Sequence, residues 1–370
     1  MKIRTLRSAI RAHGKAEARS TGREKLSPTM LLNVYATVRT PKRPAFPHVL
    51  RSYRDVTDRE LFHHLQGFMG FVMANGERPM TSTRYHVLRH LERVRHQFAI
   101  EVEKAHMPGF EAWALEVNGL VFSTDTAVRA PDGKVLVSPE TGDPEPGAVV
   151  PHPEDARHRK AITEAELAER GLHVPAVLPP VVSELEVALR DPAEVVARAF
   201  ALFACAVRAE SLAAKEPVSV ADLKKRLPLA FEALSPKERE LMGGEPSPQE
   251  IANQVWRYEA LAVLVWALRV NGEPALPFPS AIVDVSALAE TMLKLDAKRL
   301  LAEARLRPVP EILGALDHAY RLHWLTTEAR LHPDMEIEGV EPGVVLERHY
   351  ALSWLTRFEE AEWDEVSTPT

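Results

Sequence analysis

The stretch SPQEIANQVWRYEALAVLVWALRVNG, residues 247–272, carries the signals of one complete helix. Ser247 is suited to cap the first backbone amides, Pro248 fits the first turn, and Glu250 can close a capping box. Gly272 marks the expected end, because glycine adopts the left-handed conformation that terminates many helices. The apolar stripe of this predicted helix comprises Ala252, Val255, Ala262, Val263 and Trp266.

Ionic side chains interrupt the apolar run of this helix. Arg257 and Glu259 follow Trp256 and lie between apolar neighbours. Because a charge inside a packed core is costly unless it is paired, this pattern indicates a helical core with a buried or half-buried charged element. We expect a carboxylate from elsewhere in the chain to pair with Arg257. The candidate carboxylates are Asp317, Glu347 and Asp364.

Length and composition indicate a soluble globular protein with at least two domains. The chain has 370 residues, of which 45% are hydrophobic and 26% charged, and single cores stop growing at roughly 250 to 300 residues. The single cysteine, Cys205, excludes an intrachain disulfide and fits a reducing compartment. The first 15 residues lack the apolar run of a signal peptide, and no stretch approaches the roughly 20 apolar residues of a bilayer span. We therefore expect a cytoplasmic protein with no membrane partner.

The charge is distributed unevenly along the chain. Residues 1–54 hold 13 Lys or Arg and two acids, hence +11, so with a net charge of −6 the remaining residues carry −17. A basic arm of this kind can contact nucleic acid or a membrane, or it can lie on its own acidic body. The arm has few aromatic residues and no recognisable nucleic-acid module. We therefore expect it to lie on the acidic body, without a nucleic-acid partner.

The N-terminal residues 1–137 predict an α+β domain. β-branched and aromatic residues predict strands, capping residues open helices, and Asn-Gly or Asp-Gly pairs mark hairpin turns. A helix opened by Thr57 and Glu60 is expected to stop at Gly67. The predicted strands are 31–38, 68–74 and 98–103, the predicted helices are 58–66 and 83–97, and the predicted hairpins are 113–122 and 128–137.

Residues 138–182 are rich in proline and charge and predict a linker with one short helix at 163–171. Everything after it, residues 183–370, predicts an all-α domain. A nearly all-apolar helix begins at Asp191 and Pro192 and is expected to be central. The other expected N-caps are Ser219, Ser235, Ser247 and Asp284, and two further long helices cover 310–332 and 342–359.

Three patches of the helical half resemble a bacterial family known as domain of unknown function 4272. They are QVWRYEALAVLVWAL at 254–268, LDHAYRLHWLTTEAR at 316–330, and VLERHYALSWL followed by EWDEVSTPT within 345–370. The resemblance covers about residues 185–370 and is carried by three separate patches in order. It implies a helical fold. It implies no activity, cofactor or catalytic residue.

Polar residues in these patches are the candidates for a ligand site. Asp317 and Arg321 are spaced to bond directly on one helix. If the helices converge, arginines and carboxylates would lie beside tryptophans, which suits an anionic ligand held by guanidinium groups. The alternative is an ion network that fixes the register of the helices. The candidate ligand-binding residues are Arg257, Glu259, Asp317, Arg321, Trp324 and Glu347, with Arg348, Trp256 and Trp354 nearby.

Metal binding and catalysis have little support in the sequence. His86 and His90 are four residues apart, as in zinc sites, but arginines surround them and no further ligand is spaced to join them. We expect no metal, cofactor or catalytic residue. The leading interpretation is a non-enzymatic binding or protein-interaction module, whose partner is an unknown protein or a small anionic ligand. The alternative is an enzyme or small-ligand sensor that binds an anion at the Arg/carboxylate/Trp cluster.

Overall fold

The computed structural model describes residues 29–332 and 334–370. The described residues form two compact units, which are divided between Pro153 and Glu154. Their boundary lies inside the proline-rich segment 138–182. The part of the basic arm that precedes residue 29 lies outside the described residues.

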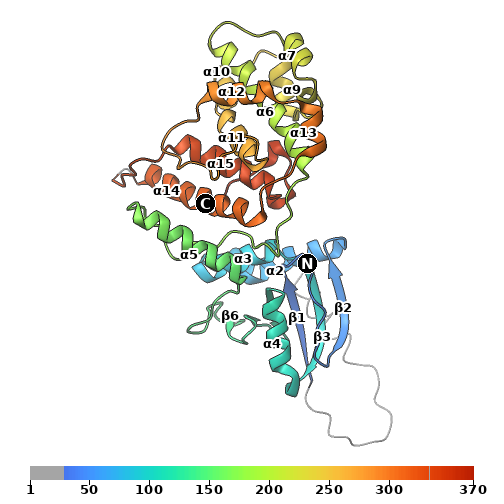
Figure 1. Ribbon diagram of the computed structural model, residues 1–370. Coiled ribbons are helices and arrows are strands. Elements are labelled where there is room, and N and C mark those ends of the chain that lie inside the picture. The colour runs from blue at the N-terminus through green and yellow to red at the C-terminus, as the bar shows by residue number, and fades with distance from the viewer. Residues whose placement is uncertain (1–28, 333) are drawn as a thin grey trace, which may run out of the picture. The chain divides into compact units, whose positions relative to one another are not determined.

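The first unit is an α+β structure with a six-stranded antiparallel sheet (Figure 1). Its strands are β1 (Thr29–Ala36), β2 (Val49–Asp55), β3 (His96–Glu103), β4 (Gly119–Ser123), β5 (Val128–Arg129) and β6 (Val135–Val137). Its helices are α2 (Arg59–Val72), α3 (Ser82–Glu92) and α4 (Met107–Glu116), with short 3-10 helices at Ala74–Gly76 and Lys104–His106. The strand order is β2-β3-β1-β4-β5-β6, so β1 pairs with both β3 and β4.

The sheet has a core on each face, because successive side chains of a strand point to opposite sides. On one face Tyr35 of β1 packs in a cluster with Phe68 of α2 and residues of α3. On the other face Val34 of β1 packs with Phe98 of β3 and Trp113 of α4. Figure 1 shows α4 running beside the strands. The alternation along β1 thus gives the first unit two buried layers.

The prediction of a helix that stops at Gly67 and is followed by a strand at 68–74 is wrong. Helix α2 continues to Val72, and its buried residues Leu61, Leu65, Phe68 and Val72 follow helical spacing. A short apolar run does not distinguish a strand from a buried helix by itself. The helix is capped by Asp58, whose side chain accepts from the amide of Glu60, rather than by Thr57.

The segment 113–122 is a helix followed by a strand and not the predicted hairpin. Helix α4 ends at Glu116, and Asn118 turns the chain with a φ of 46°. A Cβ on Gly119 would lie 2.5 Å from Val34 Cγ1, so glycine is needed for the close approach of β4 to β1. The predicted hairpin at 128–137 is confirmed, since β5 and β6 pair around Gly133.

The regular elements described in the second unit are all helices. They are α5 (Glu154–Glu169), α6 (Pro192–Ala213), α7 (Val220–Arg226), α8 (Pro228–Glu232), α9 (Pro236–Gly243), α10 (Pro248–Val255), α11 (Arg257–Ala267), α12 (Val285–Lys294), α13 (Ala297–Glu303), α14 (Val309–Leu331) and α15 (Pro342–Leu355), with 3-10 helices at Phe358–Glu360 and Trp363–Glu365. The predicted fold class, an α+β part followed by an all-helical part, is confirmed. No helix in the described ranges is long and apolar enough to cross a lipid bilayer.

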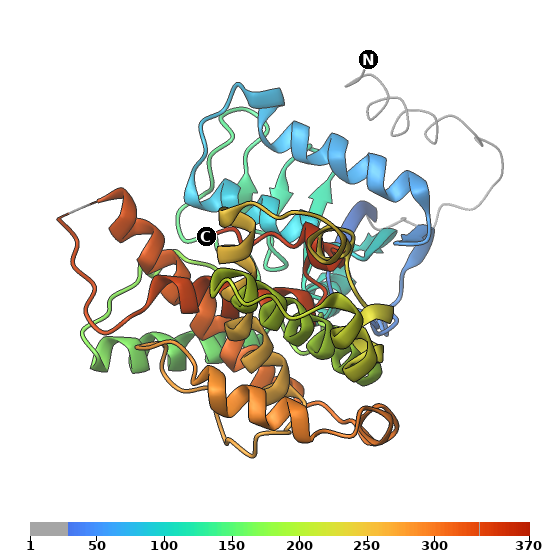
Figure 2. The same ribbon diagram turned by 90° about the horizontal axis from the view of Figure 1, so that it is seen from above.

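Helix α6 lies at the centre of the helical core and contacts α8, α9, α10, α11, α12 and α13. It begins at the predicted cap Asp191 and buries residues on most of its surface. Helix α14 packs on α15 and on α5, and Figure 2 shows α5 running beside α14. The four other predicted caps are confirmed by side-chain hydrogen bonds at Ser219, Ser235, Ser247 and Asp284.

The predicted single helix over 247–272 is two helices, α10 and α11, which meet at Trp256. The amide of Glu259 bonds the Trp256 carbonyl three residues back, which breaks the regular ladder. The break leaves Trp256 37% exposed, and its ring covers Gly343, where a Cβ would lie 2.5 Å from the indole. The second helix ends before Arg269, which has a φ of 61°, and not at Gly272.

Candidate functional site

Arg257 and Glu347 form an ion pair between α11 and α15. Arg257 Nη1 donates to Glu347 Oε2 at 2.9 Å, so the expected carboxylate partner of Arg257 is Glu347. The guanidinium also lies 4.4 Å from the ring centroid of Tyr350 and 5.5 Å from that of Trp363. Burial raises the pKa of Glu347, and the charge of Arg257 opposes this shift.

Glu259 and Arg348 form a second, longer contact between the same helices. Glu259 Oε2 lies 3.9 Å from Arg348 Nη2. The amide of Val283 donates to the other oxygen of Glu259, and Arg348 donates to the carbonyl of Pro277. Burial raises the pKa of Glu259 and lowers the pKa of Arg348. The two charges therefore hold the segment 277–283 between α11 and α15.

Asp317 and Arg321 belong to a different cluster, on the side of α14 that faces α5. Both side chains are fully buried, and Arg321 binds Asp317 through two bonds of 2.8 and 3.0 Å. The same guanidinium donates to Glu164 of α5 at 3.1 Å and to the carbonyl of Pro179 at 3.3 Å. Arg321 thus connects α14 to α5, and its donors are engaged inside the protein.

The tryptophans do not surround one cluster. Trp324 packs against the small apolar cluster of Leu322 and Val345, whereas Trp354 lies under the guanidinium of Arg190 at 4.6 Å. Of the six candidate residues, the structure brings Arg257, Glu259 and Glu347 together. It places Asp317, Arg321 and Trp324 elsewhere in the helical unit.

Trp363 is a residue that the sequence analysis missed. It is 4% exposed, and its ring contacts the rings of Tyr350 and Trp354. The guanidinium groups of Arg198 and Arg257 lie 5.1 and 5.5 Å from it. Trp363 lies in EWDEVSTPT, part of the third sequence patch that resembles the family, and this could have marked it as a candidate residue. The neighbouring Asp364 accepts from the amide of Lys237 and is not the partner of Arg257.

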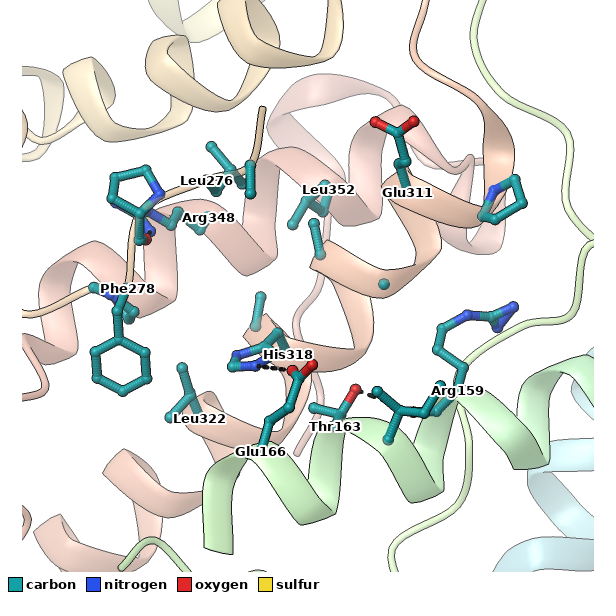
Figure 3. A pocket seen from close by; sticks show the side chains of 18 of the residues that line it. Arg159, Thr163, Glu166, Leu276, Phe278, Glu311, His318, Leu322, Arg348 and Leu352 are labelled. Carbon is teal, nitrogen blue, oxygen red and sulfur yellow. Dashed lines mark hydrogen bonds and ion pairs between the residues drawn. The ribbon is translucent and has the colours of Figure 1, made fainter. Parts of the chain in front are cut away.

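An open groove of about 990 Å³ lies between α5, α14 and the segment 274–279, with α15 beneath it (Figure 3). One face of α5 and one face of α14 form its walls, since the lining residues of each helix recur every three or four positions. The α5 residues are Asp155, His158, Arg159, Ile162, Thr163, Glu166 and Glu169, and Arg170 follows directly after the helix. The α14 residues are Pro310, Glu311, Gly314, Ala315, His318, Ala319 and Leu322, and those of α15 are Val345, Arg348 and Leu352.

The part of the α14 wall formed by Gly314, Ala315 and Ala319 is apolar, and it is called the floor of the groove below. It has open space above it, since a Cβ placed on Gly314 would meet no atom within 4 Å. Ile162 of the α5 wall is 46% exposed. Phe278 closes one side, with its ring edge-on to His318 at 6.4 Å. The guanidinium of Arg170 lies 4.2 Å from the centroid of the same ring.

His318 and Glu166 face each other across the groove, as Figure 3 shows. His318 Nε2 lies 3.2 Å from Glu166 Oε2. Burial lowers the pKa of His318, although the carboxylate of Glu166 opposes this shift. The imidazole is therefore neutral near pH 7, and it leaves the negative charge of Glu166 in place.

Carboxylates outnumber guanidinium groups along the groove. The lining holds five Asp or Glu and three Arg, hence a formal charge of −2 when the histidines are left out. Asp155 pairs with Arg159 at 2.9 Å. No ion pair among the described residues engages Glu169 or Glu184. The sequence analysis missed this groove because it predicted only a short helix at 163–171 inside a linker, whereas α5, one wall of the groove, already begins at Glu154.

The histidines of α3 have other contacts. His90 is fully buried, and its Nε2 lies 3.1 Å from the carbonyl of Tyr35. The ring of His86 meets the ring of His152 at 5.8 Å. Within residues 29–332 and 334–370, no group of three or more His, Cys, Asp or Glu is arranged to hold a metal ion.

Comparison with known proteins identifies a family. The family model described as Domain of unknown function (DUF4272) matches residues 159–366, which include α5 from Arg159 onward and the other walls of the groove. This match confirms the resemblance seen in the three sequence patches. No curated protein and no solved structure matches the chain. The chain therefore belongs to the DUF4272 family.

Proposed function

We propose that this chain is a binding protein whose helical unit holds a ligand in the groove between α5 and α14. The observation that carries the proposal is the open apolar floor at Gly314, in a groove whose α5 wall also exposes Ile162. Ligand sites are concave, mostly apolar and about 300 to 1,000 Å³ in volume, with a few polar groups that orient the ligand. The groove, at about 990 Å³ with the polar pair of Glu166 on α5 and His318 on α14, fits this description.

The Arg/carboxylate cluster is better suited to a structural role. Arg321 is fully buried, and its donors are engaged by Asp317, Glu164 and a carbonyl. Arg257 is neutralised by Glu347 and covered by aromatic rings. An anion would have to displace these carboxylates to reach either guanidinium. We therefore propose that these pairs fix the packing of α5, α11, α14 and α15, and that the ligand lies in the groove.

A substitution that fills the groove tests the proposal. Because the position of a Cβ on Gly314 is open and Gly314 lines the groove, we expect Gly314→Phe to place a ring in the groove. A suitable neutral probe is 4-phenylbutanol, whose aromatic and alkyl parts match the apolar floor. We expect saturation-transfer NMR and calorimetric titration to detect its binding to the wild type and not to the variant.

The matched control is Gly67→Phe. Gly67 is also a helical glycine whose Cβ position is open, but it lies on α2 of the first unit. This variant should bind the probe like the wild type. Binding that survives Gly314→Phe, or no binding of the probe to the wild type, would contradict the proposed function.

A further inference from the structure

We propose that the ligand of this groove is a small organic cation, with an apolar body on the floor and an amine beside Glu166. The inference rests on the proposed function and adds the charge of the ligand. The inferred cation has the opposite charge to the anionic ligand expected from the sequence. The reason is that the groove is lined by other side chains than the arginine cluster considered there. The inference rests on charge complementarity between the negatively charged groove and a positively charged amine.

The excess negative charge lies on the α5 side of the groove. Glu166 and Glu169 are three residues apart on α5 and both line the groove. The positive groups nearby are largely engaged: Arg159 binds Asp155 and the carbonyl of Val182. Glu311 on the opposite wall is matched by Arg307 at 3.0 Å. The remaining carboxylates therefore set the sign of the field that a ligand meets.

Glu166 is positioned to receive a cation. One of its oxygens is held by His318 across the groove, and the side chain is 56% exposed. The pKa of His318 is lowered by burial, so the contact orients the carboxylate without cancelling its charge. Because the second oxygen has no hydrogen bond among the described residues, it can accept one from an ammonium group.

Arg170 is the positively charged residue of the groove that could attract an anionic ligand. The position of its guanidinium group makes this role smaller. Arg170 lies four residues after Glu166, a spacing at which ion pairs form on a helix. Its guanidinium instead lies 4.2 Å from the Phe278 centroid. This cation–π contact shows that the aromatic wall accepts a positive group. The charge of Arg170 is exceeded by the carboxylates of Glu166 and Glu169.

Three probes that share one body and differ in charge test the inference. They are 4-phenylbutylammonium, 4-phenylbutanol and 4-phenylbutanoate, titrated into the full chain at pH 7 and low salt. We expect the ammonium probe to bind about fivefold more tightly than the alcohol, as for one partly exposed ion pair, and the carboxylate probe to bind most weakly. Added salt should reduce only the advantage of the ammonium probe.

Glu166→Gln identifies the carboxylate responsible. Glutamine retains an acceptor for His318, so this variant should bind the ammonium probe and the alcohol with equal affinity and leave the affinity for the alcohol unchanged. Glu290→Gln is the control, because Glu290 is an exposed residue of α12 that pairs with Lys294 and does not line the groove. It should keep the fivefold preference.

The outcomes separate this inference from the proposed function. If the three probes bind equally and Gly314→Phe blocks them all, the groove binds ligands but the inferred charge is wrong. If the carboxylate probe binds most tightly, Arg170 selects the ligand and the inference is overturned. If none of the probes binds the wild type, or Gly314→Phe leaves their binding unchanged, the proposed function fails as well.

Discussion

Arg321 lies at 0% exposure in α14 and is surrounded by acceptors from α5, from its own helix and from the carbonyl of Pro179. The pair with Asp317 is equally buried. A buried pair contributes little net stability compared with apolar residues of the same size, but removing one partner leaves the other charge without compensation. The stability of the helical unit should therefore depend on both residues being present or both being absent.

We expect Arg321→Met to lower the free energy of unfolding by about 3 to 5 kcal/mol, because it leaves Asp317 buried and charged. Urea denaturation followed by circular dichroism measures this change. The double variant Asp317→Leu/Arg321→Met should be more stable than the single variant. Arg299→Met, which removes an exposed pair with Glu303 on α13, is the control and should cost less than about 1 kcal/mol. Wild-type stability of Arg321→Met would refute the structural role.

His323 and His349 form a second buried polar pair, between α14 and α15. Their Nδ1 atoms lie 2.9 Å apart, so one ring donates and the other accepts. Burial lowers the pKa of His349 to about 3, and burial together with the charge of Arg330 lowers the pKa of His323 to about 4. The folded pair therefore stays neutral at pH values where unfolded histidines are protonated.

The stability of the wild type should consequently fall as the pH decreases from about 6.5 toward 4. In that window the unfolded chain binds more protons than the folded chain, and each histidine contributes a slope of about 1.4 kcal/mol per pH unit. Urea denaturation of His349→Asn between pH 6.5 and 4.5 should give a shallower slope. Equal slopes for His349→Asn and the wild type would contradict this account.

The sequence predicts some of these residue contacts and leaves others undetermined. An arginine inside an apolar helix requires a carboxylate, which makes a partner for Arg257 predictable. The choice of Glu347 depends on the tertiary structure, because Asp317 is taken by Arg321 and Asp364 by the amide of Lys237. The spacing of Asp317 and Arg321 predicts their own bond directly. It does not predict that their cluster is separate from Arg257.

At the scale of elements, local signals predicted the helix starts well. Side-chain caps at Ser219, Ser235 and Asp284 depend on residues three positions apart, which the sequence displays. The errors at 68–74 and 113–122 lie in short apolar runs, where packing decides between helix and strand. The groove was not predictable in the same way, because its walls come from helices that are distant in sequence.

Gly67 tests the corrected helix α2. Its Cβ position is open, and alanine restricts the unfolded chain and favours a helix, so Gly67→Ala should raise the free energy of unfolding by about 0.5 to 1 kcal/mol. Gly119→Ala is the opposite case, since its Cβ would lie 2.5 Å from Val34 Cγ1. We expect it to lower stability by about 1 to 3 kcal/mol. Thermal and urea denaturation compare the two variants, and a loss of stability in Gly67→Ala would argue against a continuous helix.

At the scale of the whole molecule, composition and periodicity were sufficient for the fold class. The switch from alternating strand patterns to helical spacing separates the α+β part from the helical part, and two sets of core clusters correspond to it. The family match over residues 159–366 covers most of the second unit. The basic character of residues 1–54 is a property of composition alone, and its contact with the acidic body stays a prediction.

The position of Trp363 has a consequence for synthesis of the chain on the ribosome. This ring completes the core of the helical unit, between Arg198, Arg257, Tyr350 and Trp354. The first unit has all of its strands by Val137 and can fold while translation continues, since domains generally fold as units from the N-terminus. We expect the core of the helical unit to be completed only after residue 363 has left the exit tunnel. Until then we expect its partly assembled helices to expose apolar surface that a chaperone can recognise.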